Sequence, residues 1–303
     1  MNNTEYQQNI TVQYCFPDNN ASCRKELHTP TNLLILSLAV ADLLVGLFVM
    51  PVNIIKLIDT CWYLGKVACS VFPVINSLSL SGSLCSLILI AVDRYIAVSD
   101  PLLYSSRITV CKMAVYIILG WSFCLMYVFV FTYFNDHLTP SQMSTKCYGQ
   151  CVLIIKHSWA IAGIVISFLA PCSVILVLYS LIFNVARRQA KAVRAVKNGA
   201  SRQHGVKVSS SSETKAAKTL SIVIVVYLAC WIPFNICSLF GQNITSLSIM
   251  WILLVWLILI NSCMNPLIYA IFYQWFRASV KYIVTCRIFE NSSSRLYLFS
   301  DHV

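Results

Sequence analysis

Long apolar runs separated by short polar stretches make up most of the chain after residue 30. Each of six runs is long enough to cross a bilayer as a helix, which takes about 20 residues. These runs are Thr31–Ile58, Cys69–Val98, Met113–Phe134, Ser158–Val185, Ala217–Phe240 and Ser248–Tyr273. The pattern therefore predicts an all-α transmembrane protein whose bundle of six spans occupies residues 31–273.

Polar segments surround and divide this bundle. Residues 1–30 carry glycosylation sequons, which predict a lumenal segment. The sequon asparagines are Asn2, Asn9 and Asn20. Residues 186–216 are rich in Arg, Lys and Ser, which predicts a flexible cytoplasmic loop. Residues 274–303 begin with alternating aromatic, apolar and basic positions, which predicts a short interfacial helix followed by a cytoplasmic tail.

The composition supports this interpretation. The chain is 58% hydrophobic and 11% charged, whereas soluble domains carry about 25% charged residues. A basic cluster at residues 187–218 contributes much of the net charge of +11, and basic loops of membrane proteins stay in the cytoplasm. Nucleic acid is not expected as a partner, because no soluble domain is present to hold it. Counting spans back from the basic loop puts the N-terminus in the cytoplasm, which conflicts with its sequons.

Seven of the 14 cysteines fall inside apolar runs, where a free thiol behaves as a small buried hydrophobe. Cysteines outside the membrane on the oxidising side are expected to pair. Cys69 begins the second run, and Cys147 and Cys151 lie between two runs. We expect a disulfide from Cys69 to Cys151 or Cys147, with Cys151 favoured. Cys15, Cys23 and Cys147 are candidates for a second disulfide.

Asp42 is the one acidic residue deep inside an apolar run. A charge at this depth is costly, so it marks a functional site by default. One interpretation is an interhelical hydrogen bond. The other is a sodium or proton site, because oxygen-bearing side chains suit a small hard cation. The residues of that candidate sodium site are Asp42, Ser83, Asn261, Ser262 and Asn265.

The second run carries two charged residues near its end, Asp93 and Arg94, followed by Tyr95. Asp93 and Arg94 are adjacent, so they are expected on different faces of a helix. Arg94 is therefore expected to pair with Glu213, near the start of the fifth run, unless both are ordinary charges at helix ends. Asn76 precedes Asp93 by 17 residues, or about 25 Å of helix. One helix can thus carry a ligand-facing group and a charged switch near opposite membrane faces.

Nothing in the chain predicts an enzyme. The sequence has no His-Glu-x-x-His or Gly-x-Ser-x-Gly motif, and its histidines lie in polar stretches or at the edges of runs. No pair of carboxylates lies at membrane depth. No cofactor is expected apart from the candidate sodium ion.

Several motifs in order resemble those of rhodopsin-class (class A) G-protein-coupled receptors, which implies a seven-helix-receptor-type bundle. They are Asn32–Leu43, Asp93–Tyr95, Trp121, Pro171 with Tyr179, Cys230–Pro233 and Asn261–Tyr269. The extension of the last motif through Phe276, together with Tyr14–Pro17 and Cys23, is similar to the trace amine-associated receptor family in particular.

The resemblance implies a chemosensory receptor in the plasma membrane. It would bind a small molecule and activate a heterotrimeric G protein of the stimulatory class, which raises cAMP. The implied ligand-binding residues are Asn76, Ser77, Leu80, Gly163, Ile164, Ser167, Trp231, Phe234, Asn235, Val255, Trp256 and Leu259. The implied switch residues are Asp93, Arg94, Tyr95, Tyr179, Glu213 and Tyr269.

The chain departs from the family pattern at two places. Asn76 stands where the family usually has an Asp that pairs with an amine, and a neutral amide gives up a charge-assisted hydrogen bond. We therefore expect weak binding of simple amines. In addition, residues 24–32 run straight into the family's second helix, so its first helix is missing here.

The missing helix leaves other functions open. The chain could be a truncated, non-signalling receptor form retained in the endoplasmic reticulum. A serotonin-like biogenic amine receptor is a further alternative, although Asn76 counts against it. A transporter or channel would use Asp42 as an ion site, but the sequence shows no internal repeat.

Overall fold

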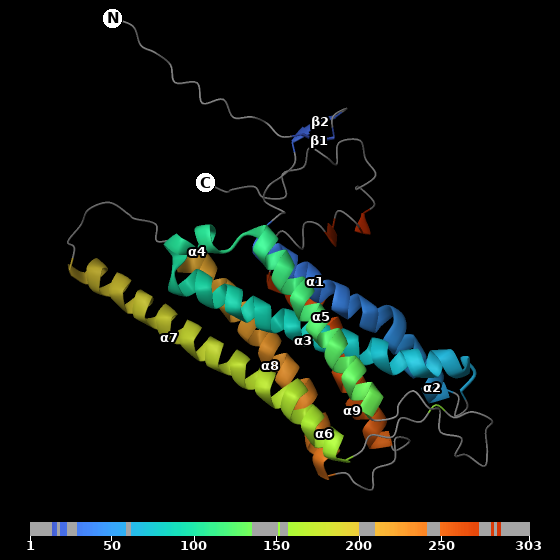
Figure 1. Ribbon diagram of the computed structural model, residues 1–303. Coiled ribbons are helices and arrows are strands. Elements are labelled where there is room, and N and C mark those ends of the chain that lie inside the picture. The colour runs from blue at the N-terminus through green and yellow to red at the C-terminus, as the bar shows by residue number, and fades with distance from the viewer. Residues whose placement is uncertain are drawn as a thin grey trace, which may run out of the picture.

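Helices make up nearly all of the described structure (Figure 1). The computed structural model describes residues 14–16, 19–22, 29–58, 62–134, 151, 157–199, 210–240, 249–272, 280–281 and 284–285. A short hairpin pairs β1 (Tyr14–Phe16) with β2 (Asn19–Ser22). The helices that follow are α1 (Pro30–Leu44), the π-helical turn η2 (Val45–Val49), α2 (Met50–Ile58), α3 (Gly65–Ser99), α4 (Pro101–Arg107) and α5 (Val110–Phe134). The remainder are α6 (His157–Ile164), η3 (Val165–Leu169), α7 (Ala170–Gly199), α8 (Ser210–Phe240) and α9 (Ile249–Phe272).

Six helical stretches of the described chain are long and apolar enough to cross a membrane. They are Pro30–Ile58, Gly65–Ser99, Val110–Phe134, Ser158–Gln189, Ser221–Leu239 and Ile249–Ile268. The prediction of six spans is therefore confirmed. The agreement is close because the length and hydropathy of a bilayer helix are both set by the thickness of the hydrocarbon core.

The start of α1 has a local cause. Thr29 is extended, and its side chain accepts a hydrogen bond from the Asn32 backbone N–H at 3.2 Å. Pro30 follows at the first helical position, where a missing N–H costs nothing. This cap fixes the residue at which the first span begins.

The long helix α3 lies at the centre of the bundle and packs against α1, α5, α7 and α8. Where α3 packs on α5, Gly82 leaves room for the indole ring of Trp121. Trp121 Nε1 donates a hydrogen bond to Ser37 Oγ at 3.0 Å, and Ser37 in turn shares a 2.8 Å hydrogen bond with Ser86. Buried polar contacts therefore tie α1, α3 and α5 together.

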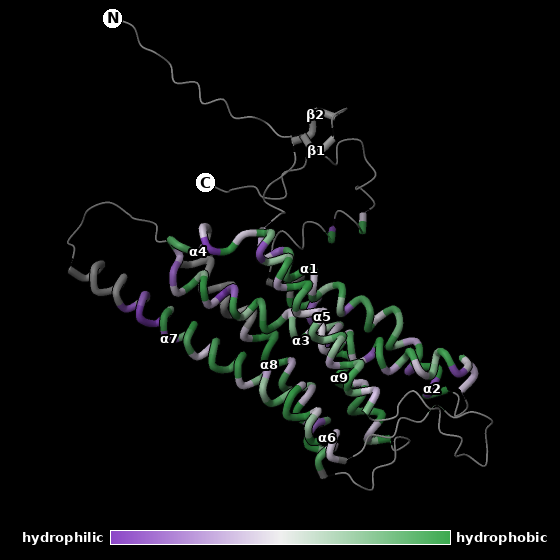
Figure 2. Tube along the Cα trace, in the orientation of Figure 1, coloured by the Kyte–Doolittle hydropathy of each residue, from purple (hydrophilic) through white to green (hydrophobic). Residues whose placement is uncertain are grey.

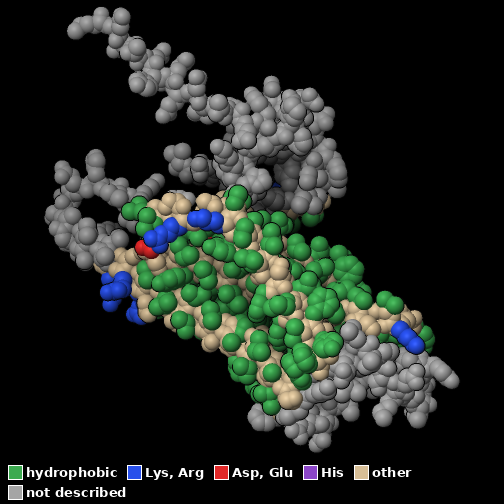
Figure 3. Space-filling model, in the orientation of Figure 1, with side chains coloured by type: hydrophobic (Ala, Val, Ile, Leu, Met, Phe, Trp, Pro, Cys, Tyr) green, Lys and Arg blue, Asp and Glu red, His purple; other side chains and the backbone are tan. Residues whose placement is uncertain are grey.

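The outer surface of the bundle is apolar along the length of its helices (Figures 2 and 3). Large side chains such as Ile118, Phe123 and Met126 of α5 point outward. A soluble protein rarely exposes so extended an apolar patch, whereas a bilayer covers it. The chain is therefore a multi-pass membrane protein.

The prediction of a loop over residues 186–216 was wrong at both ends. Helix α7 continues to Gly199, and α8 already begins at Ser210. Residues 186–199 are rich in Ala, Arg, Lys and Gln, which are strong helix formers whether or not they lie in a membrane. The predicted interfacial helix falls largely on residues 273–279, outside the described part of the chain.

Candidate ligand region and cytoplasmic switch

Two regions of different chemistry lie at the opposite ends of helix α3. At its first end, a disulfide joins Cys69 to Cys151, with the two Cα atoms 5.7 Å apart; this is the pairing favoured from the sequence. At its other end lie Asp93 and Arg94. The side chains of the other predicted cysteines, Cys15, Cys23 and Cys147, lie outside the described part. Because disulfides form on the oxidising side, the Cys69 end is extracellular or lumenal and the Asp93 end cytoplasmic.

The cytoplasmic end of α3 is organised around the Asp93 carboxylate, which is only 1% exposed. Tyr104 of α4 donates its hydroxyl to Asp93 Oδ1 at 2.6 Å, and Thr31 of α1 donates to Oδ2 at 3.0 Å. Arg94 Nε donates to Oδ2 at 3.0 Å, and the guanidinium forms an ion pair with the same oxygen. The buried charge is thus satisfied by three partners from three helices, as a buried carboxylate requires.

The expectation that Asp93 and Arg94 point apart was wrong. A long arginine side chain can fold back along the helix, so adjacency in sequence did not prevent contact. Arg94 also contacts the Thr31 hydroxyl and lies 3.4 Å from the Tyr104 hydroxyl. The side chain of Glu213 lies outside the described part of α8, so its pairing with Arg94 stays a prediction.

Thr31 and Tyr104 were not identified from the sequence. One signal was available for Tyr104: Pro101 after Asp100 starts a new helix, and this helix lays Tyr104 across the end of α3. Burial and the Asp93 carboxylate both raise the pKa of Tyr104 above its ordinary 10.0. Its hydroxyl therefore remains a donor at neutral pH. The stability that the Tyr104–Asp93 hydrogen bond contributes would decline only as the pH rises above about 10.

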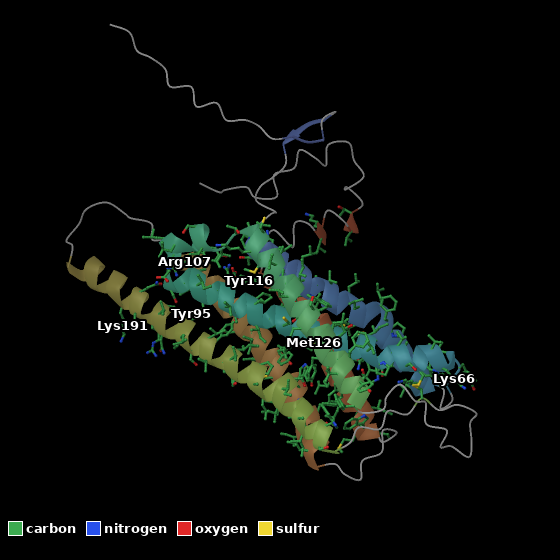
Figure 4. The ribbon with its side chains drawn as sticks, in the orientation of Figure 1. Lys66, Tyr95, Arg107, Tyr116, Met126 and Lys191 are labelled. Carbon is green, nitrogen blue, oxygen red and sulfur yellow. A yellow bond between two sulfur atoms is a disulfide. The ribbon has the colours of Figure 1, made fainter. Side chains whose placement is uncertain are left out.

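The other predicted switch residues lie on three helices at or near the same end. Tyr95 is half-buried on α3 (Figure 4). Tyr179 of α7 packs against the main core cluster, which includes Ile90 and Ile175. Tyr269 belongs to α9, and its side chain lies outside the described part.

The predicted ligand residues fall into two larger groups and a smaller third one. In the first, Leu259 of α9 belongs to a small buried cluster with Phe72 of α3, and Leu80, Val255 and Trp256 pack against it. Asn76 and Ser77 lie half-buried between Phe72 and Leu80 on α3. This group therefore joins α3 to α9 on the side of the bundle that carries the disulfide.

The second group surrounds Trp231 of α8. The indole ring stacks on Phe168 at 6.4 Å and on Tyr227 at 5.4 Å between centroids. Asn235 Nδ2 donates to the Trp231 carbonyl at 2.8 Å, and Phe234 packs on Trp251. A movement of Trp231 on α8 would therefore also be felt by η3, which carries Phe168.

The remaining predicted ligand residues lie near the start of the Ser158–Gln189 span. Ile164 is buried, and Ser167 donates its hydroxyl to the carbonyl of Gly163. A side chain at Gly163 would meet the Phe131 ring of α5 at 3.3 Å. Gly163 therefore lies at the contact between α6 and α5. The aromatic partners Phe131 and Phe168 were not identified from the sequence.

The charge of the ligand region differs from that expected of an amine site. The acidic side chains in the described part of the chain are Asp42, Asp93 and Asp100, and none belongs to either ligand group. Lys56 of α2, in contrast, places its Nζ 4.2 Å from the centroid of the Phe72 ring and 5.2 Å from that of Trp62. Such cation–π contacts hold a cation beside the α3–α9 cluster.

Four of the five residues of the predicted ion site come together in the middle of the bundle, namely Asp42, Ser83, Ser262 and Asn265, and Asn261 lies about one turn before Asn265 on α9. Asn265 Nδ2 donates to Asp42 Oδ2 at 2.9 Å, and Ser83 Oγ donates to Oδ1 at 3.5 Å. Ser262 also faces the carboxylate, although its Oγ forms no well-aligned hydrogen bond. The buried Asn261 Oδ1 has no hydrogen-bond partner among the described residues. A carboxylate and an unsatisfied buried oxygen provide a donor set that fits a sodium ion.

One central helix, α3, connects a disulfide at the outer end of the bundle to a charged cluster at the cytoplasmic end. This arrangement defines a multi-pass membrane receptor. Residues 20–269 match the family model for the seven-transmembrane receptors of the rhodopsin family. The chain is 37% identical over 294 residues to human trace amine-associated receptor 6, covering 92% of this chain and 83% of the relative. It is 40% identical over 281 residues to trace amine-associated receptor 13c of Danio rerio, covering 91% and 82%.

The chain therefore belongs to the trace amine-associated receptors of the rhodopsin family. It is accordingly a receptor and not an enzyme. The described part holds six candidate spans, one fewer than the family's name gives.

Proposed function

We propose that this chain is a chemosensory receptor of the plasma membrane that activates a heterotrimeric G protein of the stimulatory class, with a rise in cAMP. The observation that carries the proposal is the cluster around Asp93. Three helices place Arg94, Thr31 and Tyr104 around one buried carboxylate at the cytoplasmic end. Such a cluster restrains Arg94 in one packing and can release it in another.

The proposed signal begins at Trp231 and ends at Arg94. A ligand that contacts Trp231 and Phe234 would favour one packing of α8, a helix that carries Pro233 at this level. Proline leaves a carbonyl of the preceding turn without its helical partner, which makes the helix easier to bend there. The ligand thereby shifts the population between two packings of the cytoplasmic end.

The proposed ligand is a small molecule that does not depend on a carboxylate anchor. Asn76 offers a neutral amide, and Lys56 is the charged side chain placed beside the α3–α9 cluster. A primary ammonium would lose the strength of a charge-assisted bond at Asn76. It would also be repelled by Lys56. Simple amines are therefore weak ligands in this proposal.

A sodium ion is the proposed inorganic partner. Asp42, Ser83, Asn261, Ser262 and Asn265 would hold it, and the ion would supply positive charge to a carboxylate buried at mid-membrane. The residues themselves connect α1, α3 and α9, so the site would stabilise the packing of these three helices.

The test measures cAMP in cells that express the full chain. The applied panel contains primary amines and uncharged isosteres of the same size. We expect responses to isosteres at lower concentrations than to the matching amines. We also expect Arg94→Ala to remove every response, because it removes the charge that the cluster controls. Arg107→Ala, at the same end in α4, serves as the matched control.

Two results would contradict the proposal at separate points. Submicromolar activation by a primary amine would overturn the neutral character of the ligand region. A folded chain at the cell surface that leaves cAMP unchanged throughout the panel would overturn G-protein signalling of this class, and would favour the truncated, non-signalling form.

A further inference from the structure

The cytoplasmic end of α7 carries a row of polar and cationic side chains on one helix face. Asn184, Arg187, Arg188 and Lys191 follow the spacing i, i+3, i+4 and i+7, which aligns them on that face. Together they line a shallow recess of about 310 Å³. Helix α7 contains no acidic residue, so no partner on the same helix neutralises this row.

The row points away from the bundle. On the opposite face of α7, Ile182 is 2% exposed, and Gln189 Nε2 donates to the Val98 carbonyl of α3 at 3.0 Å. Helical periodicity places Gln189 about 140° around the axis from Asn184. The inward face of α7 is therefore used for packing on α3, and the cationic face looks toward lipid and solvent.

The cationic row directly continues a lipid-facing apolar surface. Val177 is 58% exposed and Phe183 61% exposed on the turns before the row. The Arg187 guanidinium lies 5.3 Å from the centroid of the Phe183 ring. Figure 3 shows the same succession, with a cluster of basic side chains at the end of α7, beyond the apolar surface, and Figure 4 labels Lys191 there. The cations thus emerge at the depth of the lipid headgroups.

We propose that this face of α7 binds the phosphate groups of an anionic, multiply phosphorylated lipid of the cytoplasmic leaflet. Arginine forks match phosphate oxygens bidentately, lysine adds a point charge, and the Asn184 amide adds a neutral donor. The outward direction of the row favours a lipid over a protein that docks under the bundle. This site is separate from the ligand region and does not depend on signalling.

The test uses the purified full chain in phosphatidylcholine nanodiscs that contain a trace of fluorescent phosphatidylinositol bisphosphate, with binding measured by energy transfer. The variant R187Q/R188Q/K191Q removes three charges from the row. Each basic residue near an anionic surface contributes roughly a fivefold factor, so we expect affinity to fall about 100-fold when all three charges are removed. The matched control K66Q/R107Q/K112Q removes three charges from other helices and should change affinity less than about threefold.

Three outcomes would overturn the proposal. Equal losses in the two triple variants would show unspecific charge attraction. Binding of soluble inositol trisphosphate as tight as that of the lipid would show a free-anion site. If R187Q/R188Q/K191Q binds the lipid normally but no longer activates the G protein, the row contacts a protein and not a lipid. An unchanged melting temperature of R187Q/R188Q/K191Q shows that its fold is intact. The variant R187K/R188K keeps the charge but loses the bidentate geometry, so we expect its affinity to lie between those of the unchanged chain and the triple variant.

Discussion

At the scale of single residues, the hydroxyl of Tyr104 decides how firmly Asp93 holds Arg94. It donates to a buried carboxylate at 2.6 Å, and hydrogen bonds to charged groups contribute about 1.5–3 kcal/mol when well shielded. Tyr104 is only half-buried, so we expect Tyr104→Phe to destabilise the protein by about 1–2 kcal/mol. We also expect basal cAMP to rise about threefold or more, because Arg94 is restrained less.

Thermal unfolding and ligand-independent cAMP check this prediction. Tyr116→Phe is the matched control, since it removes the same hydroxyl from an exposed position on α5. A Tyr104→Phe protein with unchanged melting temperature and unchanged basal cAMP would show that Asp93 is held adequately by Thr31 and Arg94 alone.

The same residues show how far sequence reasoning could reach. Asp93 and Arg94 stood out because charge at a membrane edge is rare. Thr31 and Tyr104 did not, because they come from α1 and α4, and only the folded packing brings them to α3. Lys56 was missed for a related reason, since its neighbour Phe72 lies on another helix. The sequence therefore identified Asp93 and Arg94 themselves, but it did not identify the partners that other helices bring to them.

At the scale of elements, glycine sets the distance between α3 and α5. A Cβ added at Gly82 would lie 2.8 Å from Trp121 Cη2. The indole cannot simply move aside, because its Nε1 is bonded to Ser37. Overpacking of this kind typically costs 1–3 kcal/mol. We expect Gly82→Ala to destabilise the purified receptor by about 1–2 kcal/mol in thermal unfolding.

Gly46→Ala is the matched substitution with the opposite expected sign. A Cβ at Gly46 would meet nothing within 4 Å, and Ala in place of Gly in a helix gains up to about 1 kcal/mol. Equal melting temperatures for the two variants would contradict the close packing of α3 on α5.

The elements themselves were predictable where the membrane dictates them. Hydropathy marked six spans because a bilayer requires about 20 apolar residues in each. It gave no account of α7 beyond Val185, since that end of the helix is polar. There the helix propensity of residues such as Ala186, Arg187 and Gln189 was the relevant signal.

At the scale of the whole molecule, the direction of α1 fixes the side on which the chain enters the membrane. Thr31, in the first turn of α1, bonds to Asp93 at the cytoplasmic end of α3. The opposite end of α3 carries the disulfide to Cys151. The first span therefore runs from the cytoplasm outward, and residues 1–28 contain no apolar run that could cross the membrane before it.

We accordingly expect the N-terminus of this chain to lie in the cytoplasm, against the interpretation based on its sequons. An N-terminal epitope tag should stay hidden from antibody in intact cells and become accessible after permeabilisation. The glycosylation sites Asn2, Asn9 and Asn20 should stay unmodified, because glycans are attached only on the lumenal side. A tag between Asp136 and Lys146, on the disulfide side of the bundle, is the control and should be accessible in intact cells. An exposed and glycosylated N-terminus would instead require residues 1–28 to reach the outer face by another route, and the position of Thr31 beside Asp93 would then be wrong.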